Sequence, residues 1–114
     1  MENNCILNAL KSLRENVDKV DNKVLKDNEK NVVAGMIDKL TIYYVNTYNN
    51  LVAHARGRDL FDVTVHLSCK MTDLIVKIND VIRGKADVYG VVNDIYKEIN
   101  YDASKEQFKR KRLI

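Results

Sequence analysis

Proline is absent from the 114 residues of this chain, and glycine occurs only four times. Proline is the strongest breaker of a helix interior, so its absence leaves helix permitted along the whole sequence. A small β-sandwich or barrel needs many tight turns, and those turns are normally rich in glycine and proline. The shortage of both residues therefore predicts an all-α fold.

Cysteine and long apolar runs are scarce as well. Cys5 and Cys69 are the only two cysteines, too few for the disulfide framework of a small secreted domain. No uncharged apolar run approaches the roughly 18 residues that cross a bilayer, and the first residues lack the basic start and apolar stretch of a secretory signal. We expect an intracellular protein that makes no membrane contact.

Residues that carry catalytic or cofactor chemistry are equally sparse. The glycines do not cluster into a phosphate-binding loop, and no Glu-x-x-His pair occurs that could hold a carboxylate-bridged metal centre. Asp62, His66 and Cys69 would share one face of a helix. The other histidine and cysteine, His54 and Cys5, do not lie at a spacing that completes a metal site. The sequence predicts no catalytic residue, no metal, no cofactor and no small-molecule substrate, and hence a protein that is not an enzyme.

The first stretch with a regular apolar pattern predicts a helix near residues 3–26. Its apolar residues recur at alternating intervals of four and three, at Ile6, Leu10, Leu13, Val17, Val20 and Val24. This period is typical of a coiled-coil seam, and polar side chains surround it. Two interpretations stay open: a peripheral helix of a bundle, or a helix that packs against another chain. We predict these six residues as a protein interface with a partner or a second copy.

Three further helices are indicated downstream. The second, which begins after the polar cluster at 27–31, has a wide apolar face and should end near Ala55, with Gly57 closing it. The third runs to residue 82, with Asp59 and Asp62 resembling a capping pair, although 61–67 also alternates like a strand. The fourth follows Asp87 as a cap and contains Gly90, which would allow another backbone to pack close.

Short loops between these segments predict an elongated up-and-down antiparallel bundle of about four helices, forming a single domain over 1–102. Two surface features are expected on it. A stripe of aspartates every seven residues should face solvent, at Asp73, Asp80, Asp87 and Asp94. The tyrosines should be core or boundary residues, some of them at interfaces, at Tyr43, Tyr44, Tyr48, Tyr89, Tyr96 and Tyr101.

Positive charge is concentrated at the end of the chain. Residues 1–104 hold fourteen Lys and Arg against fifteen Asp and Glu, whereas residues 105–112 hold five basic residues and one Glu. The last basic run is Lys109, Arg110, Lys111 and Arg112. Such a run can bind phosphates and also matches a simple nuclear import signal. We predict a basic tail over 103–114 that makes weak nucleic-acid contact, directs the chain to the nucleus of a eukaryotic host, or is merely solvated.

These features favour a structural or adaptor protein that acts through helix–helix contacts with other polypeptides. The abundance of Asn, Lys, Ile and Tyr is typical of A+T-rich genomes. Large DNA viruses share this bias with low-GC bacteria and some protists, so a small subunit of a viral assembly is one form this function would take. The alternative is a nucleic-acid-associated accessory protein that binds phosphate through its basic tail.

Overall fold

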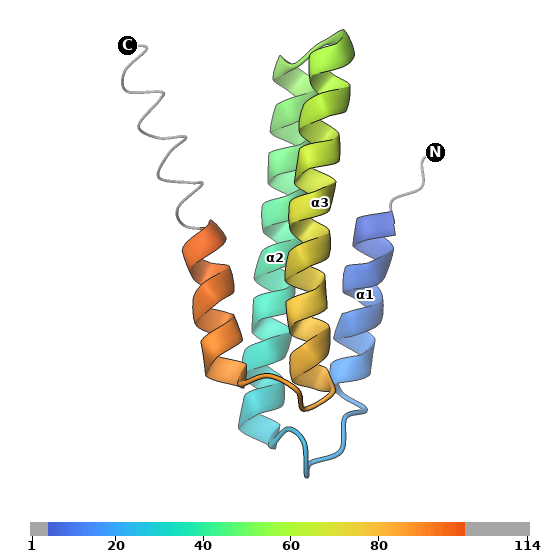
Figure 1. Cartoon of the computed structure of the whole chain (residues 1–114). Helices are drawn as coiled ribbons and strands as arrows, with labels where there is room; N and C mark the ends of the chain where they lie inside the picture. The colour runs from blue at the N-terminus through green and yellow to red at the C-terminus, as the bar shows by residue number, and fades with distance from the viewer. Residues whose placement is uncertain (1–4, 100–114) are drawn as a thin grey trace.

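The computed structural model describes residues 5–99, which contain four helices and no strand. They are α1 (Cys5–Val17), α2 (Asp27–His54), α3 (Gly57–Ile82) and a further helix over 88–99 (Figure 1). Successive helices run in opposite directions. The prediction of an all-α, up-and-down bundle of about four helices is confirmed.

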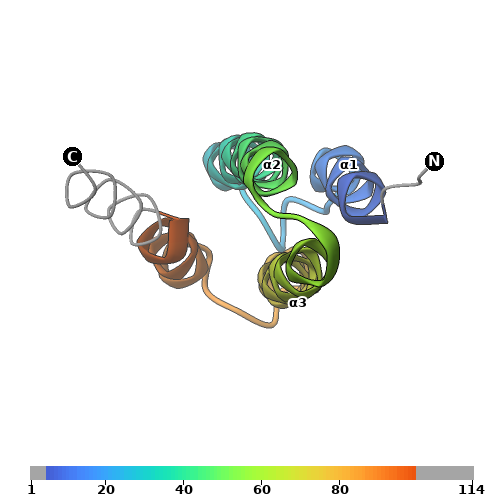
Figure 2. The ribbon, with the colours of Figure 1, turned by 90° about the horizontal axis from the view of Figure 1, so that it is seen from above.

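The two long helices, α2 and α3, form the centre of the molecule. Seen from above, α1 lies on one side of this pair and helix 88–99 on the other (Figure 2). The central helices have 28 and 26 residues, whereas α1 has 13. The described part of the chain measures 50 × 33 × 18 Å. The predicted elongated shape is therefore also confirmed.

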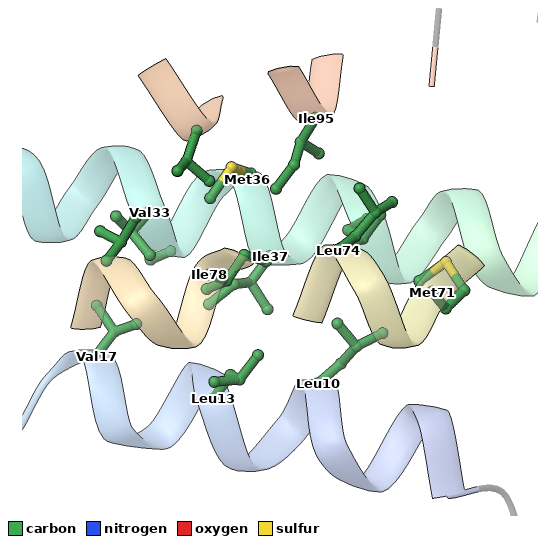
Figure 3. Packing of buried hydrophobic residues seen from close by; sticks show 14 of the residues in the cluster. Leu10, Leu13, Val17, Val33, Met36, Ile37, Met71, Leu74, Ile78 and Ile95 are labelled. Atoms are coloured by element: carbon green, nitrogen blue, oxygen red, sulfur yellow. The ribbon is translucent and has the colours of Figure 1, made fainter. Parts of the chain in front are cut away.

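The hydrophobic core extends from α1 through the central pair to helix 88–99. Leu10, Leu13 and Val17 extend from α1 toward Ile37 and Ile78 of the central pair (Figure 3). On the opposite side Ile95 of helix 88–99 packs beside Met36 of α2 (Figure 3). No polar or charged side chain is buried among residues 5–99. The core is therefore formed by apolar side chains and the ring of Tyr44.

The first helix ends earlier than its periodicity predicted. It stops at Val17, and residues 18–26 form turns in which the backbone N–H of Lys23 donates to the Asp21 carboxylate at 2.8 Å. A short acidic side chain that binds the backbone in this way competes with helix formation. Leu25 is 1% exposed and enters the core, whereas Val24 is 41% exposed. The predicted helix over 3–26 was thus wrong in its last nine residues.

The central helices are joined by a very short connection. Gly57 has a φ of +57°, as expected of a glycine at a helix boundary, but it is the first residue of α3 and the extended Ala55 is the cap that ends α2. Arg56 precedes α3 and has no side-chain capping bond. The predicted capping pair of Asp59 and Asp62 is therefore not formed.

Residues 61–67 are helical, so the alternative of a strand is wrong. The Thr64 hydroxyl donates to the Leu60 carbonyl at 2.8 Å, which satisfies a β-branched polar side chain within the helix. Asp87 is confirmed as a cap, because its carboxylate accepts the Gly90 N–H at 2.8 Å. A Cβ on Gly90 would meet this carboxylate at 3.3 Å, so the expected approach of another backbone is not the reason for the glycine.

Candidate protein-interaction surface

The predicted interface seam of the first helix is largely inside the chain's own core. Its four helical members are buried against the rest of the bundle: Ile6, Leu10, Leu13 and Val17. Val20 is partly buried in the following turns. A partner could reach the four buried side chains only if α1 left the bundle. In the single chain they stabilise the fold, and an interface through them stays a prediction.

The remaining sequence-predicted features are spread over the surface or fall outside the described residues. Lys109, Arg110, Lys111 and Arg112 lie outside residues 5–99, as does Tyr101. Of the four aspartates in the predicted solvent stripe, Asp80 is partly buried and the others are exposed. Asp62, His66 and Cys69 are all exposed on α3, and no group of three or more potential metal ligands is found within residues 5–99.

The tyrosines divide between core and surface. Tyr44 is buried, and the ring of Tyr48 lies 6.0 Å from it at the edge of the core. The Tyr43 hydroxyl accepts a hydrogen bond from the Lys70 ammonium at 3.2 Å, and this ammonium also lies 5.5 Å from the Tyr43 ring centroid. Tyr89 is exposed on helix 88–99. The expectation that they are core or boundary residues holds for Tyr43, Tyr44 and Tyr96, which are buried or partly buried, whereas Tyr48 and Tyr89 are exposed.

The far half of the α2–α3 pair has no fully buried side chain, although Val45 and Leu51 pack partly against the core. We call residues 45–66 the hairpin tip and the remaining described part of the molecule the base. No residue of the hairpin tip is buried, whereas every buried residue of the described chain lies in the base. Figure 1 shows that α2 and α3 project beyond the ends of α1 and helix 88–99. Two helices alone can cover only the sides that they turn toward each other.

The hairpin tip exposes large apolar side chains. Phe61 is 68% exposed, and Tyr48, Val52 and Val65 are exposed as well. The α2 half of the tip also lacks charge, because no Asp, Glu, Lys or Arg occurs in the sixteen residues from 40 to 55. The α3 half of the tip is charged, at Arg56, Arg58, Asp59 and Asp62. Only the α2 half therefore combines exposed apolar side chains with an absence of charge. This combination is unusual for a surface that meets only water.

A second apolar strip follows the side of α3 that points away from the core. We call it the outer face of α3, and its members are Phe61, Val65, Cys69, Thr72 and Val76. All five are exposed, at spacings of four, four, three and four residues. These spacings put them on one side of the helix, opposite the buried Leu67, Met71 and Leu74. A shallow depression runs along this strip between Thr64 and Asp73.

Both surfaces were missed at the sequence level. The apolar residues of the third predicted helix occupy two opposite sides of α3, one buried and one exposed. The spacing of Phe61, Val65 and Val76 was a signal that could have revealed the outer face. For the hairpin tip the charge-free run from 40 to 55 was visible in the sequence, but such a run is equally typical of a buried helix, and the exposure of the tip depends on where the flanking helices lie.

Comparison with known proteins identified no relative of this chain. No protein-family model matches the chain, and neither a curated protein nor a solved structure gives a significant match. None of the helices within residues 5–99 is long and apolar enough to cross a membrane.

Proposed function

We propose that this chain is a structural or adaptor protein that acts by packing the hairpin tip and the outer face of α3 against other polypeptides. The observation that carries this proposal is the contrast within one pair of helices: α2 and α3 are packed on both sides in the base and bare in the tip. The apolar tip residues add little to the fold of the single chain. Their burial against another polypeptide would supply the missing cover.

The composition of the two surfaces supports protein contact over solvent exposure. The centres of protein interfaces are depleted in charge and enriched in aromatic residues. The α2 half of the hairpin tip shows both properties, since Tyr48 is exposed in a stretch without charged residues, and Phe61 on α3 adds a second exposed aromatic ring. Moving an exposed side chain of this size out of water contributes about 1.5–3 kcal/mol if burial is complete. Phe61 alone could therefore contribute substantially to binding.

Site-directed photo-crosslinking tests this function. A photo-reactive amino acid is introduced in place of Phe61 in the full chain, expressed in the source cells, and adducts are resolved by mass spectrometry. Ile42 is the matched control, because it is 59% exposed but lies on α2 beside Tyr96 and Ile99, away from the tip. We expect a discrete protein adduct at position 61 that is several-fold stronger than at position 42. Equal adducts at both positions, or none at position 61, would count against the function.

The predicted alternative rests on the sequence of the tail. Five basic residues in 105–112 could contact phosphate with weak affinity that falls steeply with salt. This proposal is tested by measuring binding of a fluorescent single-stranded oligonucleotide at 50 and 200 mM salt, with the full chain and a version lacking 105–114. Binding that disappears with the tail or at the higher salt supports it. Binding that is absent in both versions contradicts it, and leaves the hairpin function untouched.

A further inference from the structure

Four of the five residues of the outer face of α3 form a symmetric pattern, and Phe61 lies outside it because its counterpart is Asp80. Val65 and Val76 lie at equal distances along the sequence from a midpoint between residues 70 and 71. Cys69 and Thr72 lie at equal distances from the same midpoint. If two such helices pack antiparallel, each residue of a pair meets the other member on the second copy. The two valines would then contact each other twice, with small side chains at the centre that allow the helices to approach closely.

The charges beside this face follow the same pattern. Asp62, His66, Asp73 and Lys77 lie on one flank of the outer face. Asp62 and Lys77 lie at equal distances along the sequence from a midpoint between residues 69 and 70, one residue before the midpoint of the valines. His66 and Asp73 lie at equal distances from this same midpoint. In an antiparallel pair the same flank of both helices meets. Each acidic side chain of these pairs would then face a basic or titratable side chain of the second copy.

One pair along this flank is unfavourable. Asp59 and Asp80 would lie opposite each other. Arg58 and Arg83, which match each other about the midpoint of the valines, would lie beside them, so that the two acidic and two basic side chains offset one another. A parallel arrangement is worse, because opposite flanks then meet. The charged flank would face the uncharged side of α3 that carries Ser68 and Ile75. Charge complementarity therefore selects the antiparallel orientation.

We propose that a second copy of this chain occupies the outer face of α3, in an antiparallel two-fold pair centred near residues 70 and 71. This inference rests on the proposed function, of which it names one partner. The site is open for such a copy, since α1, α2 and helix 88–99 all lie on the other sides of α3 (Figure 2). A two-fold symmetric pair buries the same patch on both chains, so the assembly stops at a dimer and no unpaired patch remains exposed.

The extent of the face sets the strength of the pair. From Phe61 to Val76 the outer face spans about 22 Å at 1.5 Å per residue. One helix pair of this length covers less than the roughly 800 Å² per partner of a standard stable interface. We therefore expect a weak dimer, with a dissociation constant on the order of 10–100 μM, in reversible exchange with the monomer.

Solution mass measured by sedimentation over 1 μM to 1 mM tests the dimer in the full chain. We expect the mass to rise from one copy to two, and Val65→Asp to abolish the rise without changing the helix content seen by circular dichroism. Ile42→Asp is the matched control, because it adds the same charge at an exposed apolar site away from α3. A wild-type chain that stays monomeric, or a Val65→Asp variant that dimerises like wild type, overturns the proposal.

Engineered cysteines test the orientation. In a background with Cys5→Ser and Cys69→Ser, one chain carries Val65→Cys and another carries Val76→Cys. An antiparallel pair forms the mixed disulfide at least several-fold more readily than either chain forms a disulfide with itself. A preference of Val65→Cys for its own copy indicates a parallel pair and overturns the proposal.

The crosslinking experiment at position 61 separates this inference from the function beneath it. Adducts between two copies of the chain support both. An adduct with a different protein, together with a monomeric mass at 1 mM, overturns the dimer and leaves the interaction function in place. The absence of any site-dependent adduct together with a monomeric mass contradicts both.

Discussion

The base and the hairpin tip of this molecule are built from the same two helices, yet they differ in almost every physical respect. In the base, α1 and helix 88–99 cover opposite sides of the α2–α3 pair, and the apolar side chains are buried (Figures 2 and 3). In the tip the pair has no flanking helix within the described residues, and comparable side chains such as Phe61 and Val52 face solvent. The difference shows that an apolar helix stripe becomes core only where a neighbour covers it.

The comparison also separates stability from interaction. The base holds the buried residues whose packing stabilises the fold. The tip and the outer face of α3 hold apolar residues that add little to the stability of the single chain. Substitutions of buried side chains in the base should therefore change the free energy of unfolding, whereas substitutions of exposed apolar side chains in the tip should change association. Four experiments test this division, from the largest expected effect to the smallest.

The largest effect is expected from a charge placed in the base. Leu13 of α1 is 6% exposed, so Leu13→Asp would bury a carboxylate without a partner. We expect the free energy of unfolding to fall by at least about 4 kcal/mol, enough to unfold much of the chain. Urea unfolding followed by circular dichroism measures this loss. A variant that keeps wild-type stability but no longer associates would instead show that the seam of α1 is an interface.

A matched pair of truncations on α3 gives the next largest difference. Met71→Ala removes a fully buried side chain from the base and should lower the free energy of unfolding by about 2–5 kcal/mol. Phe61→Ala removes a larger but exposed side chain from the tip and should change it by less than about 0.5 kcal/mol. Both values come from the same urea titrations, performed at micromolar protein so that the monomer is measured. Similar losses for the two variants would contradict the division between base and tip.

Loss of the cap of helix 88–99 should weaken the base by a smaller amount. The Asp87 carboxylate accepts the Gly90 N–H at 2.8 Å, and Asp87→Ala removes this bond. We expect a cost of about 1 kcal/mol in the free energy of unfolding, with Asp87→Asn retaining most of the wild-type value. Hydrogen exchange should show faster exchange in residues 88–99 than in wild type. Unchanged exchange there would mean that packing of Ile95, and not the cap, holds the helix.

Two glycines give effects of about the same size as the loss of the cap, with opposite signs. Gly35 lies within α2 in the base, and a Cβ there would meet nothing within 4 Å, so Gly35→Ala should stabilise the chain by about 0.5–1 kcal/mol. Gly57 has a φ of +57° at the connection in the tip, so Gly57→Ala should destabilise it by about 1–2 kcal/mol. Thermal unfolding of the two variants beside wild type measures both shifts. A stabilising Gly57→Ala would show that this connection relaxes freely.

Local features of the sequence were enough to predict the class of fold. The absence of proline, the apolar periodicity and the Asp87 cap all act over a few residues, and they correctly predicted four helices and no strand in the described part of the chain. The end of α1 was misjudged for a related reason. Val20 and Val24 continue the helical spacing, but the backbone contacts of Asp21 and the burial of Leu25 outweigh that pattern.

The sequence by itself determined which segments are helical and which of their sides are apolar, because helix propensity and periodicity are properties of neighbouring residues. Only the tertiary structure decided which apolar sides are covered. The seam of α1 is buried because α2 and α3 lie against it. Phe61, Val65 and Val76 are exposed because no helix within residues 5–99 lies against that side of α3. Burial depends on segments that are distant in the chain, and the period of a single helix contains no information about them.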